Sequence, residues 1–201
     1  MVVTVRTGSS TSVDLVSDHL RALADGVRRL APAAATIRSW AEDLARVFRA
    51  GGMVLACGNG GSAAEAQHLT GELVGRFRAD RPALPAIALC ADSATTTAIV
   101  NDYGSEEMYA RQVRGYGRPG DVLVALSTSG TSPNVVAAAK AGLENGLTVW
   151  ALTGPAPNPL ASMADAAIAV EAATTATVQE LHLSIVHALC LALDSALGVP
   201  T

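Results

Sequence analysis

Aromatic residues and lysine are scarce in this chain, and each scarcity excludes a kind of protein. Aromatic side chains make up only 3% of the 201 residues, although half of the residues are hydrophobic. This mixture favours close-packed helices and parallel strands over a recognition surface rich in Trp and Tyr. Lys140 is the only lysine, and its segment has the pattern of a surface helix, so Schiff-base chemistry is not expected.

The chain also lacks an excess of positive charge and any paired spacing of cysteines. A formal net charge of −4 argues against binding to nucleic acids or anionic membranes, both of which favour basic patches. Cys57, Cys90 and Cys190 lie in apolar sequence, with no CxxC motif and no Cys/His zinc pattern. We interpret them as core residues in a reducing compartment, and expect a cytoplasmic protein without a nucleic-acid partner.

Neither end of the chain has the pattern of a targeting or membrane segment. Residues 1–12 mix Val with Thr, Ser, Arg and Gly, and predict no signal peptide because they have no apolar core. Residues 181–197 are apolar but include His182, His187 and Asp194, so we expect them to be too short and too polar to span a bilayer. They predict a buried helix and no membrane partner.

Short apolar runs alternate with segments of helical spacing along the chain. The runs are nearly uniform in apolarity, as expected for parallel strands that are covered on both faces. Strands are predicted at residues 53–57, 85–89, 121–126, 147–152 and 166–170. Helices are predicted at about 14–30, 34–50, 62–78, 92–100, 105–116, 132–145, 157–164 and 175–197.

This alternation predicts a single α/β domain, with a doubly wound parallel sheet and helices added at both ends. Within residues 1–201 we expect a loosely ordered start (1–12), N-terminal helices (13–51), an α/β core (52–174) and a C-terminal helix (175–198). In such a sheet ligands bind at the carboxyl ends of the strands. Two glycine- and serine-rich junctions, residues 58–62 and 127–134, fall there.

The first junction, GNGGS at residues 58–62, follows a predicted strand and opens a helix. Its glycines allow a tight turn and bring backbone N–H groups close to a ligand at the positive end of the helix, which suits a phosphate. The run also satisfies G-x-G-x-x-A, a pattern typical of dinucleotide-binding proteins. For that alternative the nearest ribose-binding acid is Asp92, which comes later than the usual spacing of about 20 residues.

The second junction, STSGTSPN at residues 127–134, has five hydroxyls in six positions immediately before a helix. Hydroxyls, free N–H groups and the helix dipole together suit a dianionic phosphate held without lysine or arginine. Ser132 before Pro133 also fits an N-cap followed by proline at the first helical position, so a structural role for this serine is an equal alternative. No GKS or GKT follows, so this is not a Walker A loop.

Histidine and acidic residues at helical spacing predict a chemically active cluster. His68 and Glu72 are four residues apart and share a face of the helix that begins at the first junction, which suggests acid/base or metal chemistry. In the last helix, Gln179 and His187 are separated by about 80° and can lean toward one cleft. His182 and His187 are about 140° apart, so one of these histidines is structural or exposed, and spacing leaves open which.

Together these motifs resemble the sedoheptulose-7-phosphate isomerases (phosphoheptose isomerases) of the sugar-isomerase (SIS) domain superfamily. The similarity runs from about residue 40 to 197. The serine-rich loops indicate the superfamily, and the His68/Glu72 and Gln179/His187 pairs indicate the phosphoheptose branch. The resemblance implies a flavodoxin-like SIS fold, a homotetramer with active sites at subunit interfaces, and a bound zinc ion.

The resemblance also implies a role for each matching residue. The implied zinc ligands are His68, Glu72, Gln179 and His187, of which the amide is the least usual ligand. The implied phosphate site consists of Ser127, Thr128, Ser129 and Ser132. The sugar would be lined by Asn59, Gly60, Gly61, Asn101 and Asp102, and contacted by Glu72 and Gln179.

The implied reaction converts the ketose sedoheptulose 7-phosphate to the aldose D-glycero-D-manno-heptose 7-phosphate through an enediol. It needs a base for the carbon acid, an acid at the oxygens and an electrophile for the enediolate. We assign the carbon proton to Glu72 and the oxygen proton to His187, with zinc polarising the carbonyl group.

One residue departs from the family pattern. The family carries an aspartate three residues before the glutamine, where this chain has Ala176. The missing carboxylate implies an altered sugar preference, slower proton transfer or lost catalysis. The alternatives are therefore a non-catalytic SIS-domain regulator that binds a sugar phosphate or a replication initiator protein, an isomerase for another phosphosugar, and a nicotinamide-dependent dehydrogenase. The complete set of candidate ligands favours an enzyme over a scaffold.

Overall fold

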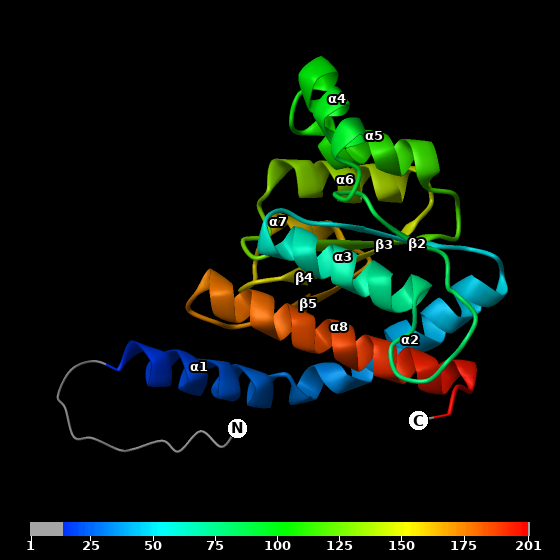
Figure 1. The fold of residues 1–201 in the computed structure, drawn as a ribbon. Helices are drawn as coiled ribbons and strands as arrows, with labels where there is room; N and C mark the ends of the chain where they lie inside the picture. Colours follow the sequence, from blue (N-terminus) through cyan, green and yellow to red (C-terminus); the bar gives the residue numbers. More distant parts are fainter. Residues whose placement is uncertain (1–13, 201) are drawn as a thin grey trace.

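The computed structural model describes residues 14–200, in which a five-stranded parallel sheet carries helices on both faces (Figure 1). The order β2-β1-β3-β4-β5 is that of flavodoxin-like folds, which confirms the predicted doubly wound sheet. All five predicted strands are present: β1 (Val54–Cys57), β2 (Ala86–Ala88), β3 (Val122–Ser127), β4 (Thr148–Thr153) and β5 (Ala166–Ala169). The prediction for residues 1–12 lies outside the described residues.

The helices form a layer on each side of the sheet (Figure 1). One face is covered by α2 (Ala34–Arg49), α3 (Gly61–Val74) and α8 (Thr175–Leu197). The other is covered by α5 (Glu107–Tyr116), α6 (Pro133–Glu144) and α7 (Pro159–Met163). Helix α1 (Leu15–Arg29) packs on α8 and is joined to α2 by the 3-10 turn η1 (Ala31–Ala33), whereas α4 (Ser93–Tyr103) packs on α5 and projects beyond the sheet.

Two hydrophobic cores explain the nearly uniform apolarity of the strands. Successive side chains of a strand point to opposite faces, so Val122 and Val124 enter the core with α2, α3 and α8, while Leu123 enters the other. In the first core Trp40 of α2 stacks on Trp150 of β4, with ring centroids 4.5 Å apart. Both faces of the sheet are therefore buried, as is typical of parallel strands.

Helix α8 is a core helix, although it is unusually apolar. The helix has 23 residues and contains an 18-residue window whose mean hydropathy is 1.4. By length and composition alone it could therefore cross a membrane. The expectation that this segment is too short and too polar was therefore wrong. Half of that window is buried inside the protein, where Leu181, Ile185 and Leu189 pack in the first core. The predicted buried helix is confirmed.

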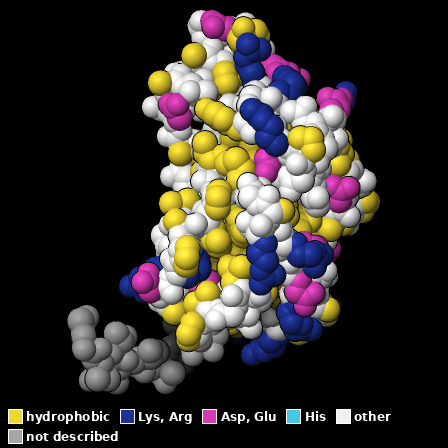
Figure 2. Space-filling view, turned by 90° about the vertical axis from the view of Figure 1, so that its right-hand side faces the viewer, with side chains coloured by type: hydrophobic (Ala, Val, Ile, Leu, Met, Phe, Trp, Pro, Cys, Tyr) yellow, Lys and Arg dark blue, Asp and Glu magenta, His cyan; other side chains and the backbone are white. Residues whose placement is uncertain are grey.

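The carboxyl ends of the strands lie at the left of Figure 1, where α3 and α8 begin. Figure 2 views the opposite side of the molecule, on which basic and acidic side chains are interspersed among apolar ones and neither sign of charge collects. The two junctions that the sequence predicts to bind a ligand follow β1 and β3, and so lie on the side facing away from Figure 2.

Candidate functional site

The two predicted ligand loops are neighbours because β1 pairs with β3. Between them the side chains of Asn59 and Asn134 form a reciprocal amide pair. Asn59 Nδ2 donates to Asn134 Oδ1 at 2.9 Å, and Asn134 Nδ2 donates to Asn59 Oδ1 at 2.8 Å. The loop after β1 is tight, since a Cβ atom at Gly58 would lie 2.6 Å from the carbonyl oxygen of Ser62. These contacts hold the two loops in a fixed relation at the carboxyl edge of the sheet.

The hydroxyls of the second loop converge. Ser127 Oγ lies 3.1 Å from Ser132 Oγ and accepts a hydrogen bond from the backbone N–H of Gly130 at 3.1 Å. Ser132 occupies the N-cap position of α6, but its side chain makes no capping hydrogen bond. Its hydroxyl therefore faces Ser127 instead of closing the helix. A pocket of about 220 Å³ beside this loop is lined by Thr128, Ser129 and the residues around the start of α8.

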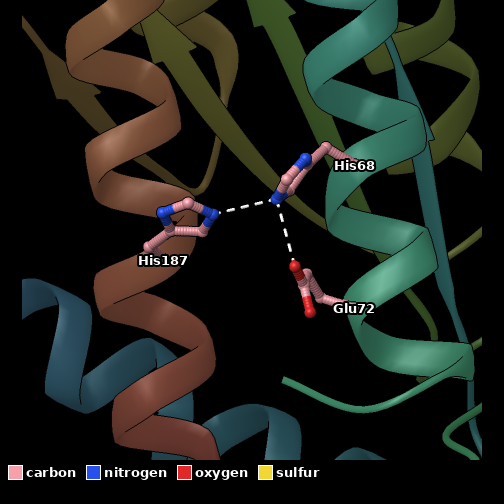
Figure 3. A group of neighbouring side chains, drawn as sticks. All are labelled: His68, Glu72 and His187. Atoms are coloured by element: carbon pink, nitrogen blue, oxygen red, sulfur yellow. Dashed lines mark hydrogen bonds and ion pairs between the residues drawn. The ribbon is translucent and has the colours of Figure 1, made fainter. Parts of the chain in front are cut away.

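Helices α3 and α8 bring two histidines and a glutamate together (Figure 3). His68 Nε2 lies 2.8 Å from His187 Nε2 and 3.1 Å from Glu72 Oε1. One ligand atom from each residue lies within 4.8 Å of the other two. His68 is exposed and the other two are half-buried, so the cluster is accessible from solvent. Three of the four predicted metal ligands thus form one group.

The donor set of this cluster fits a zinc ion. Imidazole nitrogen and carboxylate oxygen are usual zinc ligands, and catalytic zinc commonly takes three protein ligands with a further position open. The two Nε2 atoms face each other at hydrogen-bond distance, so at least one of them carries no hydrogen and offers its lone pair. Neutral imidazoles are the form that binds a metal.

The fourth predicted ligand, Gln179, lies on α8 with His187. It precedes His187 by eight residues, or about 12 Å along the axis of α8. Its amide packs against the start of α3, where a Cβ atom at Gly61 would lie 2.4 Å from Gln179 Nε2. Gly61 therefore leaves room for this amide. Gln179 lies beside the first loop, and its predicted contact with the metal stays a prediction.

Two of the predicted sugar-lining residues lie on α4, the helix that projects beyond the sheet (Figure 1). Asn101 and Asp102 are exposed in the last turn of α4, where Asn101 Nδ2 donates to Asp102 Oδ1 at 2.9 Å. Asp92, the candidate ribose ligand of a dehydrogenase, caps the start of the same helix. Its Oδ2 accepts from Thr95 Oγ1 at 2.6 Å, and this bond holds the pKa of Asp92 below its usual range. The carboxylate is therefore already used as a helix cap.

The structure settles which histidine of α8 is structural. His182 is fully buried, and its Nε2 lies 3.1 Å from the carbonyl oxygen of Thr153. Because a carbonyl only accepts, this nitrogen carries the hydrogen. Its Nδ1 faces the buried carboxylate of Glu65 at 3.7 Å. Sequence reasoning missed Glu65, for which the one available signal is its position one turn before His68 on α3.

A buried arginine fixes the end of α3 beside Glu72. Arg81 Nη2 donates to the backbone carbonyl of Glu72 at 2.7 Å, Nη1 donates to that of Leu73 at 2.8 Å, and Nε pairs with Asp194 Oδ1 at 3.0 Å. The guanidinium thus satisfies carbonyls in the last turn of the helix. The predicted helix 62–78 was too long, because α3 stops at Val74 before Gly75.

Comparisons with known proteins agree with this architecture. The family model described as the SIS domain matches residues 18–154. The chain is 61% identical to a phosphoheptose isomerase of Streptomyces coelicolor over 158 residues, 79% of this chain and 68% of the relative. It is 46% identical to that of Halorhodospira halophila over 91% of this chain and 92% of the relative.

Two solved structures of similar proteins share the whole fold. Phosphoheptose isomerase GmhA from Neisseria gonorrhoeae superposes with a TM-score of 0.79 at 40% identity, over 90% of this chain and 95% of that one. A phosphoheptose isomerase from Francisella tularensis superposes with a TM-score of 0.83 at 37% identity, over 92% of this chain and 100% of that one. With the SIS-domain match, the strand order and these full-length similarities, the chain belongs to the phosphoheptose isomerase family.

Proposed function

We propose that this protein is a ketose–aldose isomerase that interconverts sedoheptulose 7-phosphate and D-glycero-D-manno-heptose 7-phosphate. The observation that carries the proposal is the His68/Glu72/His187 group, on α8 and on α3, which begins at the first ligand loop, in a chain whose relatives are named phosphoheptose isomerases. The phosphate would bind to the hydroxyls of Ser127, Thr128, Ser129 and Ser132 and to the N-terminus of α6.

The residues of the cluster suit the proton transfers of this reaction. In the forward direction the carboxylate of Glu72 would remove a proton from C1 of the ketose and return it to C2 of the enediol, while His187 would move a proton between the two oxygens. Zinc, held by His68, Glu72 and His187 and in our proposal also by Gln179, would polarise the carbonyl group when bound. Arg81 supports this geometry, because it holds the backbone of Glu72.

We further propose that the chain is a single cytoplasmic domain that assembles as a homotetramer with active sites between subunits. Leu15, Val16 and Leu20 of α1 are 74%, 70% and 58% exposed, which is unfavourable for an isolated subunit. A pocket of about 710 Å³, lined mostly by apolar residues of α1, α2 and α8, lies on the same side. A subunit interface would also allow α4 of one copy to bring Asn101 and Asp102 to the cluster of another.

A discontinuous assay of purified protein with sedoheptulose 7-phosphate, following the aldose with and without a chelator, tests the proposal. We expect turnover that is lost with the chelator and restored by zinc. Glu72→Gln and His187→Gln should each lower kcat by at least about 100-fold, whereas Lys140→Ala, on the exposed side of α6, should leave it unchanged.

Near-normal turnover of the Glu72 and His187 variants would contradict the assignment of the two protons. A folded protein that binds the sugar phosphate but does not convert it would favour the regulator. Ala176 is exposed in the first turn of α8, one turn before Gln179, so Ala176→Asp then tests whether the family carboxylate restores turnover.

A further inference from the structure

The amide of Asn59 is held by two buried side chains that have no role in the assignments above. Asn134 exchanges two hydrogen bonds with it, and the hydroxyl of Tyr109 lies 3.2 Å from Asn59 Oδ1 and 2.6 Å from the carbonyl oxygen of Gly58. Asn134 and Tyr109 are 9% and 3% exposed, whereas Asn59 is exposed. One exposed amide at the ligand edge is therefore held by two buried partners.

The backbone fixes which way both amides point. The N–H of Val135 donates to the carbonyl oxygen of Ser132 at 3.1 Å and lies 3.0 Å from Asn134 Oδ1. The amide nitrogen of Asn134 in that place would set two donors against each other, so the oxygen of Asn134 faces Val135. The nitrogen of Asn134 then faces Asn59, which must present its own oxygen in return. Burial raises the pKa of Tyr109, so its hydroxyl keeps its hydrogen, which goes to the nearer acceptor, the carbonyl oxygen of Gly58 at 2.6 Å.

Counting donors and acceptors leaves one group free. Asn134 uses its oxygen for Val135 and Asn59, and its nitrogen for Asn59 and the sulfur of Met108 at 3.6 Å. Asn59 uses its oxygen and one of its two N–H hydrogens for Asn134. The second N–H of Asn59 is therefore available to a ligand.

We propose that Asn134 and Tyr109 are positioning residues that aim the free N–H of Asn59 at an oxygen of the bound sugar. The proposal rests on the proposed function and adds the residues that hold this donor in place. The same amide pair joins the loop after β1 to the first turn of α6. It therefore fixes the distance between the donor for the sugar and the hydroxyls for the phosphate.

The test compares Asn134→Leu, Tyr109→Phe and a matched control, Gln112→Leu. Gln112 is a buried amide of α5, 5% exposed, that donates to the carbonyls of Leu89 and Met108 and makes no direct hydrogen bond to Asn59, Asn134 or Tyr109. Each zinc-supplemented protein is assayed for kcat, for thermal stability, and by calorimetry for the Kd of sedoheptulose 7-phosphate and of inorganic phosphate. Inorganic phosphate probes the hydroxyl loop without the sugar.

We expect Asn134→Leu to lower kcat by about 10- to 100-fold and to weaken sugar-phosphate binding, because a misplaced donor no longer meets its oxygen. Its Kd for inorganic phosphate should stay within about twofold, because the hydroxyls of the loop are intact. Tyr109→Phe should lower kcat by about 2- to 10-fold and weaken sugar-phosphate binding in the same direction. Gln112→Leu should lose thermal stability but keep kcat and both dissociation constants.

The proposal would be overturned if Asn134→Leu weakened the binding of sugar phosphate and of inorganic phosphate equally. It would also be overturned if kcat were unchanged in both Asn134→Leu and Tyr109→Phe. A wild-type protein that binds the sugar phosphate without converting it would refute the isomerase but not the positioning role, which the two dissociation constants then decide. Wild-type affinity no greater for the sugar phosphate than for inorganic phosphate would overturn the positioning role itself.

Discussion

Removing the negative charge of Asp194 should destabilise the protein far more than removing one from its surface. The side chains of Arg81 and Asp194 are 3% and 5% exposed, so water does not screen their interaction. In Asp194→Asn the guanidinium stays buried without its counter-charge, and breaking such a pair costs about 3–5 kcal/mol. The exposed pair of Asp18 and Arg21 provides the control, because Asp18→Asn should cost less than about 1 kcal/mol.

A double variant separates the charge from the hydrogen bonds of Arg81. Arg81→Met with Asp194→Leu removes both charges, and replacing a buried pair by apolar side chains is often neutral. Here, however, the carbonyl of Glu72 also loses its donor, which costs about 1–3 kcal/mol. We therefore expect the double variant to be more stable than Asp194→Asn but less stable than the wild type, with a reduced kcat because the backbone of Glu72 is no longer held.

Urea unfolding at neutral pH, followed by circular dichroism, measures all of these differences if the slope with denaturant is unchanged. A loss below about 1 kcal/mol in Asp194→Asn would refute the reasoning, since the pair would then behave as a hydrated one. A double variant as stable as the wild type would show instead that solvent replaces Arg81 at the helix end.

Two further predictions concern a glycine and the thiols. Gly130→Ala should lower the melting temperature more than Gly120→Ala. Both glycines have positive φ, but only at Gly130 would the new Cβ atom clash with another atom, Asn158 Oδ1, at 2.0 Å. Equal losses of melting temperature in the two variants would contradict the clash. Burial raises the pKa of Cys190 from 9.0 to about 12, so stability from this thiol is fully present below pH 9 and is lost as the pH rises toward 12. Native labelling at pH 8, read by mass spectrometry, should therefore modify the half-buried Cys90 and spare Cys190.

The strands and helices were predictable because their signals are local. Runs of apolar residues gave all five strands, and the bounds of α8 agree with the predicted helix 175–197. The end of α3 was not predicted well, because Phe77 follows Leu73 at helical spacing and mimics a longer helix. What stops the helix is Gly75 together with Arg81, which reaches back to its last carbonyls from outside the helix.

The candidate site was predictable only where its residues are close in sequence. His68 and Glu72 share a helical face, so their contact follows from spacing. The pairs that support the site join distant parts of the chain: Asn59 with Asn134 across 75 residues, and Arg81 with Asp194 across 113. Their partners are set by how helices pack on the sheet, which no local pattern specifies. The resemblance supplied His187, whose choice over His182 spacing alone left open.

The strand order also has a consequence for how the family diversifies. Backbone pairing of β1 with β3 sets the spacing of the two ligand loops, although β2, α4 and α5 all lie between those strands in sequence. Helix α4 packs on α5 and projects beyond the sheet, so its length and composition can drift without shifting either loop. In the proposed function Asn101 and Asp102 of α4 line the sugar, so a changed α4 would alter sugar preference while the spacing of the two loops stays the same.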